Sequence, residues 1–163
     1  MKQMILYDIG EDVFPMMKQE SLLFHALPTV KDCVGCFSCW IKTPGSCCIK
    51  DRCNDFTKEL SAIDKLIIIS PITYGGYSRN IKAVLDRSIG YLLPYFRTFH
   101  KETHHQMRYD KQFAMHVYFY GPCEQDEKEV AKQLVDANAL NLNTREHHVH
   151  FYNDVKDVYE VLL

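Results

Sequence analysis

Residues 66–87 read LIIISPITYGGYSRNIKAVLDR, and this stretch decides the fold. The unbroken apolar run at 66–69 is typical of a strand that is buried on both faces of a parallel sheet. After Ser70 and Pro71, paired glycines indicate a turn, and the apolar residues that follow recur at helical spacing. The stretch therefore predicts a strand, a turn and a helix in succession, which is the repeating unit of an open α/β sheet.

The turn in this unit runs from Pro71 to Gly76, and ligands of open α/β sheets bind at that position, outside the carboxyl ends of the strands. Pro71 and the two glycines let backbone groups lie close to a flat ring, and Tyr74 offers such a ring a stacking face. A plain connection between a strand and a helix explains paired glycines about equally well. Both interpretations stay open on these residues alone.

A second motif lies upstream. Residues 33–47 read CVGCFSCWIKTPGSC, which spaces four cysteines as C-x2-C-x2-C-x7-C. Three cysteines with two residues between them can curl around one face of a cubane iron-sulfur cluster, and glycine in the gap eases the approach of backbone to sulfide. Zinc usually takes two well-separated C-x2-C pairs, and here the second pair is missing. The motif favours a cluster over zinc, with Cys48 as a substitute for Cys47.

Together the two motifs resemble those of the flavodoxin-like NAD(P)H-dependent FMN reductases, including their iron-sulfur flavoprotein branch. The likeness spans roughly residues 33–90. It implies that one loop contacts the FMN isoalloxazine, that a second loop lies at the other edge of this ring, and that four cysteines hold a [4Fe-4S] cluster. These residues are Pro71, Ile72, Thr73, Tyr74, Gly75 and Gly76 for the first loop, Tyr120 and Gly121 for the second, and Cys33, Cys36, Cys39 and Cys47 for the cluster.

The resemblance also implies an activity. NAD(P)H would reduce FMN, and the reduced flavin would pass electrons to the cluster or to a small acceptor of the quinone type. This chemistry requires no acid or base side chain, so we predict no catalytic residue. In relatives of this type the site often lies at a subunit interface, and we therefore expect a homodimer.

One stretch departs from the family pattern. Residues 7–18 read YDIGEDVFPMMK, where relatives have a loop rich in Ser, Arg, Asn and Thr that wraps the FMN phosphate. Asp8, Glu11 and Asp12 would repel a dianion. The loss of about three charge-assisted hydrogen bonds, at roughly 1.5 kcal/mol each, weakens binding on the order of a thousandfold. An alternative is therefore a degenerate flavodoxin-fold protein without FMN that acts as a binding or assembly module, and a third is a zinc-stabilised protein.

Strand and helix patterns alternate along the chain, as in a parallel sheet that is covered on both faces. They predict one flavodoxin-like domain over residues 1–163, an α/β three-layer sandwich with a five-stranded parallel sheet in the order 2-1-3-4-5. About a dozen residues join the first two strands, so the first crossover is shortened. We expect strands at 4–7, 22–27, 65–70, 113–120 and 146–151, and helices at 55–63, 79–92, 124–139 and 154–162.

Composition narrows the class of protein. Of the 163 residues, 47% are hydrophobic and 25% are charged, which excludes a disordered chain. No apolar run is long enough to span a bilayer, and the N-terminus reaches Asp8 too soon for a signal peptide, so we expect a cytoplasmic protein. In that compartment seven cysteines favour metal or redox work over disulfides. A net charge of −2 without a basic stripe indicates no nucleic-acid partner.

Two further stretches are rich in aromatic residues or histidine. Residues 93–112 form a long connection with many aromatic side chains, which predicts a lid over the flavin or a subunit interface rather than a folded-back loop. His147, His148 and His150 fall on the last expected strand, where neighbouring side chains alternate between the two faces of the sheet. These three histidines therefore cannot all reach one ion.

Overall fold

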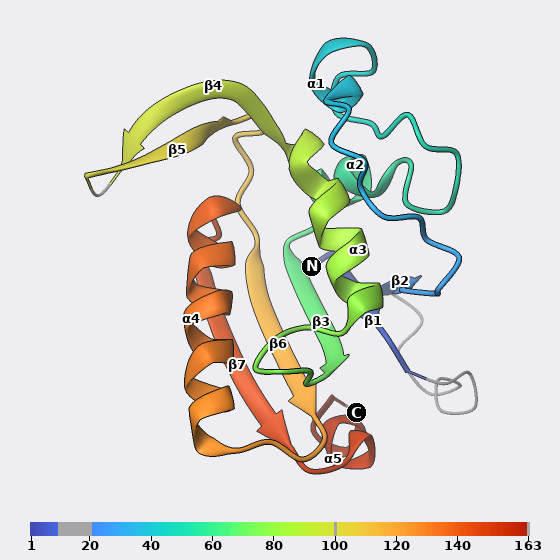
Figure 1. Ribbon diagram of the computed structural model, residues 1–163, viewed down its shortest axis with the longest axis vertical. Coiled ribbons are helices and arrows are strands. Elements are labelled where there is room, and N and C mark those ends of the chain that lie inside the picture. Colours follow the sequence, from blue (N-terminus) through green and yellow to red (C-terminus); the bar gives the residue numbers. More distant parts are fainter. Residues whose placement is uncertain (10–20, 100, 163) are drawn as a thin grey trace.

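The structure is a computed structural model, and it describes residues 1–9, 21–99 and 101–162 of the chain (Figure 1). Its main sheet has five parallel strands in the order β2-β1-β3-β6-β7. Counted within this sheet alone, the order is 2-1-3-4-5, so the predicted topology is confirmed. The strands are β1 (Gln3–Tyr7), β2 (Ser21–His25), β3 (Lys65–Pro71), β6 (Ala114–Tyr120) and β7 (Glu146–Tyr152).

Helices pack on both faces of this sheet. One face is covered by α2 (Phe56–Ser61), α3 (Arg79–Asp86) and α4 (Gln125–Asn141), and the other by α5 (Val155–Leu162). The single-turn helix α1 (Ser38–Ile41) belongs to the cysteine-rich segment. No helix in the described part of the chain combines the length and the apolar character that crossing a membrane requires.

The stretch 66–87 folds as its pattern predicts. Strand β3 is buried on both faces, with Leu66 and Ile68 in the larger core and Ile67 and Ile69 in the smaller one. Helix α3 begins after Ser78, whose hydroxyl accepts a hydrogen bond from the Ile81 N–H at 3.2 Å. The predicted helix over 79–92 is too long, because α3 ends at Asp86. A 3-10 helix, η2 (Arg87–Tyr91), follows it.

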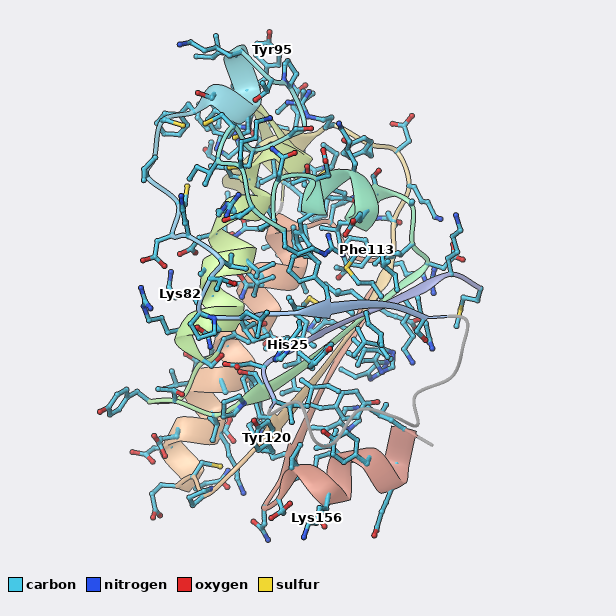
Figure 2. The ribbon with its side chains drawn as sticks, turned by 90° about the vertical axis from the view of Figure 1, so that its right-hand side faces the viewer. His25, Lys82, Tyr95, Phe113, Tyr120 and Lys156 are labelled. Atoms are coloured by element: carbon cyan, nitrogen blue, oxygen red, sulfur yellow. The ribbon has the colours of Figure 1, made fainter. Side chains whose placement is uncertain are left out.

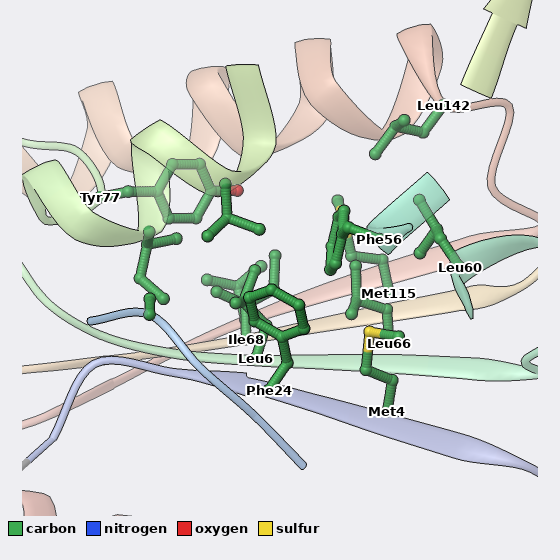
Figure 3. Close-up of a cluster of buried hydrophobic side chains, with 14 of the residues drawn as sticks. Met4, Leu6, Phe24, Phe56, Leu60, Leu66, Ile68, Tyr77, Met115 and Leu142 are labelled. Atoms are coloured by element: carbon green, nitrogen blue, oxygen red, sulfur yellow. The ribbon is translucent and has the colours of Figure 1, made fainter. Parts of the chain in front are cut away.

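The larger core fills the space between the sheet and helices α2, α3 and α4 (Figure 3). Its side chains come from the alternate positions of the strands that face these helices. Phe24 of β2 packs edge to face on Phe56 of α2, with the ring centroids 5.0 Å apart. Other members are Met4, Leu6, Leu60, Leu66, Ile68, Tyr77, Met115 and Leu142.

The aromatic stretch after η2 forms a hairpin, which the sequence does not predict. Strands β4 (Leu92–Phe99) and β5 (Glu102–Met107) pair antiparallel in a sheet of their own, which projects from the body of the molecule (Figure 1). Apolar, charged and imidazole side chains are mixed on both of its faces, so period-two alternation is weak. Tyr95 and Phe96 are 63% and 64% exposed.

The connection between β1 and β2 cannot be compared with its prediction. The acidic residues Glu11 and Asp12 and the expected short crossover lie outside the described residues. Asp8 and Ile9 are described, and both follow the end of β1 directly.

The edge of the sheet formed by β6 and β7 carries several histidines. His116 is paired with His148 across the two strands on the α5 side, and Tyr118 with His150. His147 lies on the opposite face, where its Nε2 is 2.8 Å from Asp136 Oδ1 of α4. Burial lowers the pKa of His116 to about 4, Lys65 and the two neighbouring histidines add to this effect, and Glu146 opposes it.

This shift predicts acid sensitivity between about pH 6.5 and pH 4. Above pH 6.5 His116 is uncharged in both states. Below pH 6.5 His116 becomes protonated in the unfolded chain, whereas in the folded chain it takes up a proton only near pH 4. We expect the free energy of unfolding to fall by about 1 to 2 kcal/mol over this range, after allowance for solvent screening of a half-buried group. Urea unfolding at a series of pH values with EDTA measures this change, and H116Q should flatten the curve. An equally steep curve for H116Q would contradict the assignment.

Candidate functional site

The turn after β3 is a tight, hydrogen-bonded structure. Thr73 and Gly76 exchange two backbone hydrogen bonds of 3.0 Å each, and Tyr74 and Gly75 between them have φ values of 50° and 70°. Two successive residues with positive φ form the type I′ turn of a two-residue hairpin. Tyr74 at its tip is 94% exposed. The turn therefore presents one aromatic side chain on a rigid backbone.

Gly75 meets a packing requirement that the sequence does not indicate. A Cβ at this position would lie 3.0 Å from the Glu127 carbonyl oxygen and 3.0 Å from Cβ of Val130, both in α4. The positive φ is a second reason for glycine. The close approach that requires glycine here is thus between the turn and α4. From the turn, a groove of about 460 Å³ runs between α3 and α4.

The two loops that were predicted to border a flavin do meet. The Ile72 N–H donates to the Tyr120 carbonyl oxygen at 2.9 Å, which joins the turn after β3 to the end of β6. A Cβ at Gly121 would face open space. The exposed ring of Tyr74 offers a flat ligand a stacking surface near this edge.

A carboxylate lies at the same edge. The Tyr120 hydroxyl donates to the Asp8 carbonyl oxygen at 2.8 Å, and the Asn80 side-chain amide donates to Asp8 Oδ1 at 3.2 Å. Burial raises the pKa of Tyr120 to about 12, and the charge of Asp8 acts in the same direction. Tyr120 therefore stays protonated and holds Asp8 in place. A fixed negative charge here disfavours a phosphate.

The cysteine-rich segment folds around a cavity of about 180 Å³. All four predicted ligands line this cavity, and so does a fifth cysteine, Cys48, whose Sγ lies 3.6 Å from Cys36 Sγ. Gly35 has a φ of 64°, which favours glycine at that position. The Trp40 indole N–H donates to the carbonyl oxygens of Ile89 and Leu92 at 3.1 and 2.9 Å, which anchors the segment to η2 and β4.

Arg87 borders this cavity and has no counterpart in the sequence predictions. It is 2% exposed, pairs with Asp51, and donates to the carbonyl oxygens of Lys31 and Ile49 at 3.2 Å each. Burial lowers the pKa of the guanidinium, but the hydrogen bond to Asp51 and nearby Cys53 and Cys47 outweigh burial, so the net shift is upward. Its Nε–H lies buried without a hydrogen bond among the described residues. Arg87 therefore places a guanidinium, already paired with Asp51, at the border of the cavity.

The thiols differ in how readily they ionise. Hydrogen bonds from Ser38, helped by Cys48, lower the pKa of Cys36 from 9.0 to about 7. Burial raises the pKa of Cys39, and it raises that of Cys53 to about 12. Cys53 is buried outside the cavity lining and Cys123 is half-buried. Of Cys36, Cys39 and Cys53, Cys36 is therefore the thiol closest to a thiolate at neutral pH.

The donor set fits a thiolate-bound metal group. Five thiols and a guanidinium around one cavity provide the soft ligands and the counter-charge that an iron-sulfur cluster needs. Within the described residues, no three Cys, His, Asp or Glu side chains already have the geometry that holds a metal ion. The thiols must therefore turn inward to bind one.

The flavin edge and the cysteine cavity lie at opposite ends of one chain. In Figure 1 the arrowheads of β3, β6 and β7 point toward α5, whereas α1 lies beyond the amino ends of these strands. Helix α3 and then η2 lead from the turn to the end of the molecule that holds the cysteine cavity, and together they span roughly 20 Å. Within one protomer the two sites are too far apart to share a ligand.

Comparisons with known proteins agree with this architecture. Over 56 residues, 34% of the chain, the sequence is 38% identical to an iron-sulfur flavoprotein of Methanocaldococcus jannaschii, and the match covers 28% of that protein. The chain therefore spans less than a third of the relative that it matches. It matches no family model.

Two solved structures share the fold over 99% of this chain and 93% of their own. One is an NAD(P)H:quinone oxidoreductase from Methanothermobacter marburgensis, with a TM-score of 0.60 and 12% identity. The other is an FMN-dependent NADH-azoreductase from Bacillus anthracis in complex with FMN, with a TM-score of 0.55 and 11% identity. The protein has a flavodoxin-like α/β fold. Its resemblance to the NAD(P)H-dependent FMN reductases and iron-sulfur flavoproteins is confirmed.

The thiol environments predict a selective modification. In metal-free protein we expect iodoacetamide to alkylate Cys36 first, with a rate that falls as the pH drops below about 7 because the thiolate takes up a proton. Peptide mapping by mass spectrometry measures the rate at each cysteine. S38A should move the midpoint toward 9, and buried Cys53 should stay unmodified in the folded protein. Equal rates at Cys36 and Cys39 would contradict this prediction.

Proposed function

We propose that this protein is a flavin-dependent oxidoreductase that passes electrons from NAD(P)H through FMN to a [4Fe-4S] cluster or a small acceptor. The observation that carries the proposal is the gathering of Cys33, Cys36, Cys39 and Cys47 around one cavity in a flavodoxin-like fold. The two structural neighbours, an NADH-azoreductase in complex with FMN and an NAD(P)H:quinone oxidoreductase, support the flavin half, and the partial relative, an iron-sulfur flavoprotein, supports the cluster more weakly.

At the flavin edge the protein supplies position rather than acid or base groups. When bound, FMN accepts a hydride and releases electrons singly or in pairs. The rigid turn would hold Tyr74 against one face of the ring, and the Tyr120–Gly121 end of β6 would border the other edge. Because Asp8 stands at this edge, the phosphate would be held mainly by groups other than the acidic stretch after β1.

At the cysteine cavity the protein supplies ligands and charge compensation. Arg87 would place its guanidinium, which is paired with Asp51, beside the four thiolates of a cluster. Phe37 lines the cavity and stacks on Trp40, with ring centroids 5.1 Å apart. These rings would limit the access of water and oxygen to a cluster.

A second copy of the chain completes the electron path in this proposal, because one protomer holds its two sites at opposite ends. The surface beside the cysteine cavity suits such an interface. Rings follow one another from Phe37 through Trp40 and His105 to Phe96, with centroids 4.8 to 5.1 Å apart. Tyr95, at the same end of the molecule in Figure 2, is exposed as well. Exposed aromatic side chains of this kind are enriched at protein interfaces.

A second candidate rests on Asp8. A fixed carboxylate at the flavin edge, followed by an acidic stretch, favours a flavodoxin-fold binding or assembly module that has lost FMN. This candidate keeps the interface and the cysteine cavity but has no redox activity through flavin. Zinc in the cavity would fit it as a structural metal.

The content of metal and flavin tests the proposal. Anaerobically purified protein should contain about four irons and one flavin per chain. C39S should lose most of its iron and keep its flavin, since the two sites are separate. C123S, whose thiol lies outside the cavity, should keep both. Visible absorption, metal analysis and released flavin measure this.

The other outcomes assign the protein elsewhere. A colourless protein that takes up no added FMN would overturn the oxidoreductase proposal in favour of the binding module. One zinc per chain would reassign the cysteines as a structural site. Iron that survives in C39S but is lost in C48S would show that Cys48 is a ligand and Cys39 is not.

The interface predicts a dimer. Light scattering at micromolar concentration should give twice the chain mass. Replacement of Tyr95 and Phe96 by serine should weaken dimerisation by at least about a hundredfold, because each large aromatic contributes roughly 1.5 to 3 kcal/mol on burial. V161S, at an exposed apolar site on α5, serves as the control. A monomeric wild-type protein would refute the proposed interface.

A further inference from the structure

Three imidazoles lie together on the α5 side of the sheet, away from both sites described above. His148 and His150 are two residues apart on β7 and so face the same side. His116 of β6 lies directly opposite His148 in the parallel register. The ring of His116 is 4.7 Å from that of His148 and 6.3 Å from that of His150, and the last two are 6.5 Å apart.

These separations are close to those of a three-histidine metal site. Zinc binds imidazole nitrogen at about 2.0 to 2.1 Å, which puts each ring centroid about 3 Å from the ion. Three such rings in a tetrahedral arrangement have centroids about 5 Å apart. The observed triangle, with two sides of 6.3 and 6.5 Å, is wider by roughly 1.5 Å on those sides. Rotation about the side-chain bonds of histidine covers this difference, since its χ2 angle is only weakly restricted.

The ring planes show what must change. They are inclined by 17° to 44° to one another, and His150 also stacks on Tyr118 with ring centroids 4.7 Å apart, so the rings must turn before their nitrogens can converge on one ion. This orientation agrees with the finding that the described side chains hold no ready-made metal geometry. His148 is exposed and His116 and His150 are half-buried. The exposed ring is therefore free to turn toward the other two.

Two charged side chains act on this group. Lys65 of β3 and Glu146 of β7 are both close enough to act on the charge of His116. The ammonium opposes a bound cation and the carboxylate favours it. Glu146 stands on the same face of β7 as His148, two residues away, and its Oε1 lies 3.4 Å from Arg145 Nε.

We propose that His116, His148 and His150 form a site for a divalent transition-metal ion of the Zn²⁺ or Co²⁺ type, with the fourth position open to water. Imidazole is the ligand that such ions prefer after thiolate. The site is separate from the cysteine cavity, because the histidines lie on the α5 side of the sheet and the cavity lies against η2 on the other side. The proposal does not depend on the flavin or the cluster.

Titration with Co²⁺ tests it on the full chain, purified anaerobically with its cysteine cavity in its native state. Co²⁺ bound by imidazole absorbs in the visible range only, whereas thiolate ligands add intense charge-transfer bands in the near ultraviolet. We expect one Co²⁺ per chain with the imidazole spectrum. H148Q and H150Q should each weaken this binding by at least about tenfold, since loss of even a supporting residue around a metal costs that much.

H147Q is the matched control. His147 is on the same strand but faces α4, where it contacts Asp136, so its replacement should leave Co²⁺ affinity unchanged. Because His148 is exposed, H148Q should fold, and thermal unfolding without metal checks this. The proposal is wrong if only thiolate-type absorption appears, or if H148Q and H150Q bind Co²⁺ as tightly as the wild type. The imidazoles would then be a cross-strand ladder that only stabilises the sheet.

Discussion

All strands of the main sheet are parallel, and this constraint determines at which end of the sheet each connecting segment lies. Each connection must carry the chain from the carboxyl edge of the sheet back to the amino edge. Turns at the carboxyl edge therefore gather the residues of the proposed flavin site, although they are far apart in the sequence. The return segments place η2, the β4–β5 hairpin and the cysteine-rich segment at the other end. The separation of the two sites within one chain follows directly from this topology.

The ion pair of Arg87 and Asp51 holds the second of these sites together. Burial of two charges is costly, and their attraction compensates only when the remaining donors are also satisfied. Here the guanidinium also bonds two backbone carbonyls of the cysteine-rich segment, so one side chain of η2 fixes the loop on both sides of the cavity. Such an arrangement is costly for stability alone. In the proposed cluster site it would place a guanidinium beside several thiols.

Much of the fold was predictable because its strands and helices carry strong periodic patterns. Strand β3 has an apolar centre at 66–69, and α3 and α5 have clear apolar stripes, so β3, α5 and the start of α3 agree with the sequence to within a residue or two. The β4–β5 hairpin was missed since solvent reaches most of its surface and no face is consistently apolar. The end of α3 at Asp86 was missed for a related reason, because Ile89, Tyr91 and Leu92 continue an apolar pattern through the 3-10 turn.

The sequence by itself determined the alternation of strands and helices, the turn after β3 and the spacing of the four cysteines, because these depend on residues close together in the chain. Only the tertiary structure decided which distant residues join them. It brought Cys48 and Arg87 to the cavity, assigned Gly75 to a contact with α4, and set His116 beside His148. The physical reason is register. A one-residue shift between β6 and β7 would turn the histidines to opposite faces, and no local pattern specifies that alignment.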